Sequence, residues 1–98
     1  MAELIIEKKD ERKIEKEILQ DFKRKYALNQ RELEVLQGWI AGKNNGQLAE
    51  SLYLTRQAIT YHSQNLLQKM GIENRHQIIV KIMDWLEERY FKKKGRFF

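Results

Sequence analysis

The segment from Thr55 to Lys69 combines several hydrogen-bonding side chains with a complete lack of acidic residues. If it is helical, its first turns present five polar side chains outward: Arg56, Gln57, Thr60, Tyr61 and Gln64. A glutamine amide can donate to N7 of adenine and accept from N6, and threonine or tyrosine can bond to bases or pack on a thymine methyl group. No acidic residue interrupts the segment. The pattern predicts DNA contact; the alternative is that Tyr61 and Gln64 are ordinary exposed polar residues.

A second group of residues stands at the expected starts of two helices, where phosphate groups bind well. Backbone amides near Asn45 and Arg56 would point outward there. Three polar side chains stand beside them: Lys43, Asn44 and Thr55. We expect these groups to meet DNA phosphates. Asn44 and Thr55 could instead act only as helix caps, although the two roles are compatible.

Catalytic and metal chemistry find no support in the sequence. There is no cysteine, and His62 and His76 alone do not make up a metal-ligand set. No glycine-rich phosphate loop or nucleophile motif occurs, so we predict no enzymatic activity, no metal and no cofactor. His62 is expected to pack between helices or touch a phosphate. Glu32 and Arg75 are candidates for a structural ion pair.

The proposed DNA-reading side chains need two crossed helices to hold them. Large apolar side chains fall where such helices bury their contact: Leu48, Leu52, Leu54 and Ile59. Ala49 falls where the two helices approach most closely. This spacing is typical of a helix-turn-helix, whose second helix enters the major groove of DNA.

Asparagines mark the starts of three helices. Asn29, Asn44 and Asn74 are each followed three residues later by Glu or Gln, which is the pattern of a capping box. Thr55 begins a further helix without the reciprocal partner. Helices are therefore predicted near 30–41, 45–52, 56–69 and 75–91, with Gly42 and Gly71 in left-handed conformations after helix ends.

Two flanking helices complete the expected architecture. Residues 10–26 are charged but carry one apolar stripe: Ile14, Ile18, Leu19, Phe22 and Tyr26. This helix is expected either to cover the flank of the domain or to widen a dimer. The last helix is apolar around more than half its girth, which implies a second partner surface. Trp39, Trp85 and Tyr90 share the helical spacing of the core and are expected to pack rather than stack on nucleic acid.

Length and composition agree with a small all-α protein. The 98 residues contain no proline and only five glycines, and the net charge of +5 favours a polyanionic partner. There is no apolar run long enough for a membrane span and no secretory signal. We therefore expect a cytoplasmic, nucleoid-associated protein.

Three motifs make the chain resemble the LuxR/GerE (FixJ-type) helix-turn-helix DNA-binding domain family. Residues 28–36 match its Leu-Thr-x-Arg-Glu-x-Glu-Val-Leu pattern with Asn29 in place of Thr, and residues 42–49 match Gly-x-Ser-Asn-Lys-Glu-Ile-Ala. Residues 55–65 match Ser-x-x-Thr-Val-Lys-x-His-x-x-Asn, followed at 69–75 by Lys-Leu-x-Val-x-x-Arg. The resemblance covers about residues 28–80 without insertion or deletion.

The resemblance implies a four-helix domain in which the third helix reads DNA and the fourth forms a dimer. The extra N-terminal amphipathic helix lies outside it. We expect an N-terminal extension at 1–27, the DNA-binding domain at 28–91 and a basic tail at 92–98. Gly46 and Thr60 stand where relatives usually have lysine, so weaker sequence-independent binding is expected.

The sequence therefore predicts a bacterial, sequence-specific transcriptional regulator that binds double-stranded DNA as a homodimer. The dimer would form around four residues of the last helix: Ile79, Met83, Leu86 and Tyr90. A regulatory protein is a further expected partner. Two alternatives stay open: a degenerate helix-turn-helix that sequesters another regulator, and a module similar to region 4 of a sigma factor.

Overall fold

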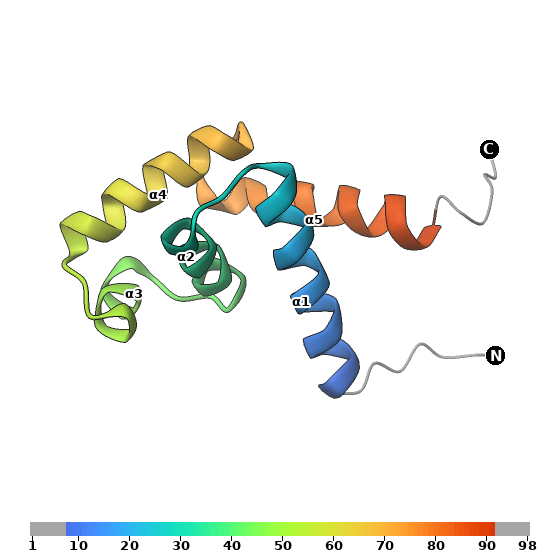
Figure 1. The fold of residues 1–98 in the computed structure, drawn as a ribbon, viewed down its shortest axis with the longest axis horizontal. Coiled ribbons are helices and arrows are strands. Elements are labelled where there is room, and N and C mark those ends of the chain that lie inside the picture. The colour runs from blue at the N-terminus through green and yellow to red at the C-terminus, as the bar shows by residue number, and fades with distance from the viewer. Residues whose placement is uncertain (1–7, 92–98) are drawn as a thin grey trace.

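The computed structural model describes residues 8–91, and in this part of the chain every regular element is helical (Figure 1). The elements are α1 (Lys8–Lys25), α2 (Gln30–Ile40), α3 (Asn45–Leu52), α4 (Arg56–Met70), a 3₁₀ turn η1 (Arg75–Gln77), α5 (Ile78–Leu86) and a π-helical turn η2 (Glu87–Phe91). The predicted all-α class is confirmed. Residues 1–7 of the predicted extension at 1–27, and the whole predicted tail at 92–98, lie outside the described residues.

The helices begin where the caps predict. Oδ1 of Asn29 accepts from N–H of Glu32 at 2.8 Å, and Oε1 of Glu32 accepts from N–H of Asn29 at 3.0 Å. Asn44 and Gln47 make the same pair of bonds, both 2.8 Å long. These side chains satisfy amides that the first turn of a helix leaves without partners. The chain between α2 and α3 is thereby held in one conformation.

The last helix differs from the prediction of one helix over 75–91. It begins as a 3₁₀ turn, where Asn74 and Gln77 form the predicted capping box and Oδ1 of Asn74 also accepts from N–H of His76 at 3.0 Å. It ends as a π-helical turn at Glu87–Phe91. That turn lies where Arg89 and Tyr90 bond to α1.

The core surrounds α2, which packs on α4 and α1, while α3 packs on α4 (Figure 1). Val35 and Leu36 of α2 are completely buried, as are Ile59 and Leu66 of α4. Gly38 of α2 permits a close approach to α3, since a Cβ built there would overlap Cδ2 of Leu48. This close approach of α2 to α3 was not predicted from the sequence. Ala49 of α3, predicted at the closest approach of the two helices of the helix-turn-helix, is buried.

Helix α1 covers the flank of the domain, which was one of the two predicted roles. Ile18 and Phe22 belong to the buried core, and Ile14, Leu19 and Tyr26 pack against it. The predicted apolar stripe is therefore confirmed. Toward its N-terminal end α1 projects away from α2 and α3, as Figure 1 shows. None of the helices among the described residues is long and apolar enough to cross a membrane.

Candidate nucleic-acid interface

Helices α3 and α4 form the predicted helix-turn-helix. Leu48 and Ile59 are fully buried between them, and Leu52 and Leu54 pack against the same core. The turn depends on Tyr53, whose backbone is left-handed (φ 57°, ψ 43°) and whose side chain is 94% exposed. N–H of Leu54 then donates to the carbonyl of Ala49 at 2.9 Å. This turn sends α4 across α3 at a fixed angle.

The outer face of α4 carries all five predicted base-reading residues, and each is exposed: Arg56, Gln57, Thr60, Tyr61 and Gln64. The inner face is buried and contains Ile59, Ser63, Leu66 and Met70. Since α4 contains no acidic residue, its exposed face offers hydrogen-bonding groups and the positive charge of Arg56, and no carboxylate of α4 repels an anion there. Such a face can lie against a polyanion and offer donors and acceptors to base edges.

The starts of α3 and α4 are capped by the residues predicted to stand there. Asn44 caps α3, and Oγ1 of Thr55 accepts from N–H of Ala58 in α4 at 3.0 Å. The capping roles are confirmed, while contact of Lys43, Asn44, Asn45 and Thr55 with DNA stays a prediction. Asn44, Asn45 and Thr55 are exposed.

The loop before α3 is also pinned from the side of α5. Nη1 of Arg75 donates to the carbonyl oxygen of Lys43 at 2.6 Å, and its guanidinium lies 5.6 Å from the ring centroid of Trp39. N–H of Lys43 donates to the carbonyl of Gly38 at 2.8 Å. The backbone that would face a phosphate is therefore preorganised by both α2 and the turn before α5.

The predicted ion pair between Glu32 and Arg75 is wrong. Glu32 is buried and instead pairs with Lys69, whose Nζ lies 2.7 Å from its Oε1 and 2.9 Å from the carbonyl oxygen of Ala27. The last turn of α4 lies over the start of α2, so Lys69 reaches the carboxylate, whereas Arg75 is occupied at Lys43. Nothing local in the sequence links residues 32 and 69.

The electrostatics of Glu32 follow from this arrangement. Burial alone would raise the pKa of its carboxyl. The hydrogen bond from Lys69, the backbone amide of Asn29 and the positive charge of Lys69 outweigh burial, so that the pKa of Glu32 lies below its ordinary value. The ion pair ties α4 to α2 behind the exposed face.

His62 lies beside that face but points inward. It is half-buried, its Nδ1 is buried without a hydrogen-bond partner, and its ring meets the ring of Tyr61 edge-on at 5.4 Å. The predicted packing between helices agrees with this placement. No set of three histidine or acidic side chains suited to a metal ion occurs among residues 12–91.

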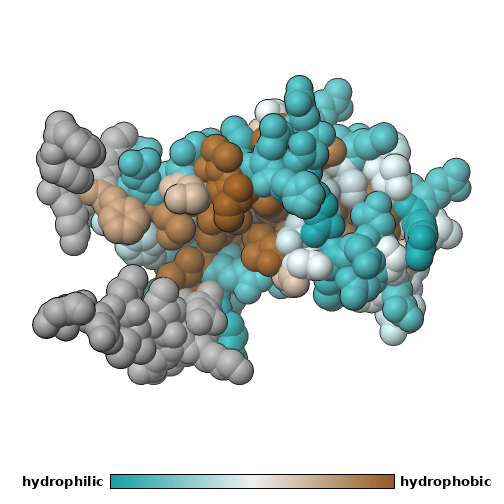
Figure 2. Space-filling model, turned by 180° about the vertical axis from the view of Figure 1, so that it is seen from behind, coloured by the Kyte–Doolittle hydropathy of each residue, from teal (hydrophilic) through white to brown (hydrophobic). Residues whose placement is uncertain are grey.

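Helix α5 exposes an apolar face. Ile79 and Met83 are 56% and 61% exposed, and Leu86 is half-buried. Figure 2 shows hydrophobic side chains gathered into a connected band across the side of the molecule where α5 runs. Val80, which is 54% exposed, extends this face at its edge and was not among the residues predicted from the sequence. Tyr90 is partly engaged within the chain, since its hydroxyl donates to Glu17 of α1 at 3.1 Å.

Comparison with known proteins identifies the family of this arrangement. The family described as "Bacterial regulatory proteins, luxR family" matches residues 26–82. The transcriptional regulatory protein DegU of Brevibacillus brevis is 35% identical over 66 residues, which cover 65% of this chain and 28% of that protein. The spore germination protein GerE of Bacillus subtilis (strain 168) is 29% identical over 63 residues, which cover 64% of this chain and 85% of GerE.

A third relative is the transcriptional regulatory protein LnrK of Bacillus subtilis (strain 168), 36% identical over 53 residues, or 54% of this chain and 24% of LnrK. The chain thus spans about a quarter of DegU and of LnrK but most of GerE. No solved structure matches it. The matched residues 26–82 comprise α2, α3, α4 and the first half of α5, and the chain belongs to the luxR family of bacterial regulatory proteins.

Proposed function

We propose that this chain is a sequence-specific DNA-binding regulator of transcription. The observation that carries the proposal is the outer face of α4, where five exposed polar side chains stand on a helix without acidic residues. A helix-turn-helix presents such a helix to the major groove. The relatives named as transcriptional regulatory proteins support the same assignment.

The side chains divide into two roles. Thr60, Tyr61 and Gln64 read base edges, with Arg56 and Gln57 at the start of the same face. The backbone amides at the starts of α3 and α4 hold phosphates, assisted by Lys43, Asn44, Asn45 and Thr55. The caps on both helices support this division, because they hold those amides in a fixed orientation.

The functional unit is a homodimer formed through α5. An exposed apolar face of this kind is unusual on a helix of a monomeric protein. It consists of Ile79, Val80 and Met83, and the half-buried Leu86 continues it. A two-fold axis that passes between two paired copies of α5 would place the two copies of α4 in successive major grooves. Half-sites would then be separated by about one helical turn of DNA, roughly 34 Å.

Within the chain, residues 28–91 form the DNA-binding domain, residues 1–27 an N-terminal extension and residues 92–98 a basic tail. Asp21 and Phe22 of the extension contact the domain. As a DNA-binding protein without a membrane-spanning helix among its described residues, the chain would act in the cytoplasm at the nucleoid.

A second candidate function is suggested by the same apolar face. A helix-turn-helix protein that no longer binds DNA could sequester another regulator through Ile79, Val80 and Met83. The absence of lysine at Gly46 and Thr60, where relatives usually carry it, favours this candidate because it removes positive charge from the DNA-facing side. A module similar to sigma region 4 fits less well. Residues after Gly71 form a further long helical segment in the manner of the luxR family.

Selection of duplexes from a random pool, followed by sequencing and salt titration, tests the proposal. We expect an enriched, roughly palindromic sequence and an affinity that falls steeply with salt. Gln64→Ala should weaken binding by about 1–3 kcal/mol and relax one base position. Gln68→Ala, one turn further along the exposed side of α4, is the matched control. Failure to enrich any sequence, with capture of a protein partner through α5, would favour the second candidate.

A further inference from the structure

The guanidinium group of Arg56 lies over Gly46, where a side chain of α3 would otherwise begin. A Cβ built on Gly46 would stand 2.7 Å from Nη2 and 3.3 Å from Cζ of Arg56. Real Cβ atoms do not approach other atoms within 3.0 Å, so any side chain at position 46 displaces this group. The packing of α4 on α3 allows the contact, because Arg56 in the first turn of α4 extends its side chain to Gly46 in the first turn of α3.

The charge of Arg56 is available to an external anion. Neither α3 nor α4 has an acidic residue in its first turn. The ion pairs found among residues 12–91 involve other cations: Arg24, Arg31, Lys69 and Arg89. Arg56 is also exposed. A planar guanidinium with several donors suits a phosphate better than a point charge does.

We infer that Gly46 and Arg56 form one phosphate-binding unit, in which Arg56 supplies from α4 the cation that family members usually carry at position 46. This inference rests on the proposed DNA binding and deepens it. Gly46 then contributes to binding, because its lack of a side chain leaves the space in which Arg56 reaches the phosphate. The loss of lysine at position 46 consequently does not weaken sequence-independent binding as the sequence alone suggests, because the charge has moved from α3 to α4.

The test compares four variants on the duplex selected for the wild-type protein. Arg56→Gln removes one cation from each protomer of the proposed homodimer, so it should lower the slope of log affinity against log salt by about two and weaken binding about fivefold per protomer at 0.15 M salt. Gly46→Ala keeps every charge but displaces the guanidinium, so it should also weaken binding. Its melting temperature should nevertheless rise by about 4 °C, because alanine stabilises a helix relative to glycine. The double variant G46K/R56Q returns a cation to position 46 and should recover most of the lost affinity and slope.

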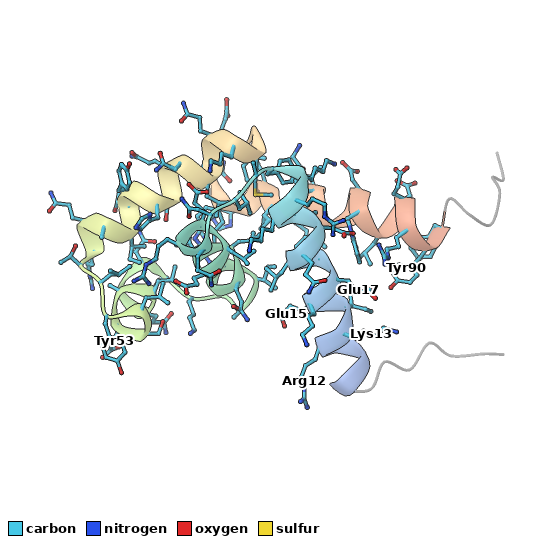
Figure 3. All side chains as sticks on the ribbon, viewed as in Figure 1. Arg12, Lys13, Glu15, Glu17, Tyr53 and Tyr90 are labelled. Atoms are coloured by element: carbon cyan, nitrogen blue, oxygen red, sulfur yellow. The ribbon has the colours of Figure 1, made fainter. Side chains whose placement is uncertain are left out.

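Arg12→Gln is the matched control, since it removes the same charge from the part of α1 that lies far from α3 and α4 (Figure 3). Circular dichroism confirms that each variant is helical. The inference is overturned if Arg56→Gln behaves as Arg12→Gln does, or if Gly46→Ala binds as tightly as the wild type. Those outcomes leave wild-type DNA binding intact. If instead the wild-type protein binds no duplex, the proposed function fails and the inference fails with it.

Discussion

The indole nitrogen of Trp85 donates a 2.7 Å hydrogen bond to Oδ2 of Asp21, joining the two parts of the chain that flank the family match. Asp21 lies in α1 before residue 26, and Trp85 lies in α5 after residue 82. Arg89 reinforces the contact: its Nη1 lies 3.1 Å from the same Oδ2, and its guanidinium lies 5.2 Å from the centroid of the Trp85 ring. The helix added by this chain is therefore bound to the end of α5 by a polar cluster.

Removal of the Asp21 carboxylate should loosen this cluster. Asp21→Ala leaves the half-buried Trp85 indole without its acceptor, so we expect a loss of about 1 kcal/mol in the free energy of unfolding. Asp21→Asn keeps an acceptor oxygen and loses only the charge, and it should cost less. Urea unfolding followed by tryptophan fluorescence measures both. Equal stability of Asp21→Ala and the wild type would show that the contact contributes nothing to the fold.

Gly38 is predicted to be irreplaceable for packing. Gly38→Ala places a Cβ where Cδ2 of the buried Leu48 lies, so α2 and α3 must separate or Leu48 must leave its rotamer. Overpacking of this kind costs about 1–3 kcal/mol, despite the higher helix propensity of alanine.

Gly46→Ala is the control for this substitution. Its new Cβ meets the flexible end of Arg56 and, at an ordinary contact distance of 3.4 Å, Oδ1 of Asn44, so its unfolding midpoint in urea should rise while that of Gly38→Ala falls. If both midpoints moved in the same direction, the close approach of α2 and α3 would not be what requires Gly38.

The lowered pKa of Glu32 predicts a loss of stability in acid. Its folded pKa lies below the unfolded value, so the stabilisation is fully present above the unfolded pKa of about 4.3 and disappears as pH falls through the folded pKa. Glu32→Gln removes this titration, and its stability should depend less on pH below about 5. The measurement is the unfolding midpoint in urea between pH 3 and 7.

Lys69→Met provides the complementary test of the same carboxylate. Without the ammonium group at 2.7 Å, burial dominates and the pKa of Glu32 rises. With its folded pKa above the unfolded value, Glu32 should no longer contribute to the acid-induced loss, and its protonation should instead raise the stability of the variant relative to neutral pH. An unchanged pH profile in both variants would mean that other carboxylates govern unfolding in acid.

These contacts show which parts of the structure can be predicted from the sequence. The caps at Asn29 and Asn44 bond to residues three positions away, so a local pattern contains both partners. The exposed face of α4 follows from helical periodicity in the same way. Local patterns therefore determine where each helix starts and which side it exposes.

The missed contacts join residues far apart in the sequence. Lys69 meets Glu32 across 37 positions and Trp85 meets Asp21 across 64, so each partner depends on how the helices cross. The contact of Arg56 with Gly46 likewise depends on the angle between α3 and α4. Residue type marks these side chains as able to pair, but only the packing selects the partner.

The exposed face of α5 predicts a dimer that one charge can disrupt. Met83 is 61% exposed beside Ile79 and Val80, so Met83→Glu should leave the monomer fold intact while placing two carboxylates in the apolar interface. An unpaired charge buried there costs several kcal/mol, which should raise the dimer dissociation constant at least a hundredfold. Sedimentation velocity across a concentration series measures this constant. Lys81→Glu is the control: it changes the charge on α5 by more than Met83→Glu does, but it lies away from this face and should preserve the dimer. If Met83→Glu sediments as the wild type does, α5 is not the dimer interface.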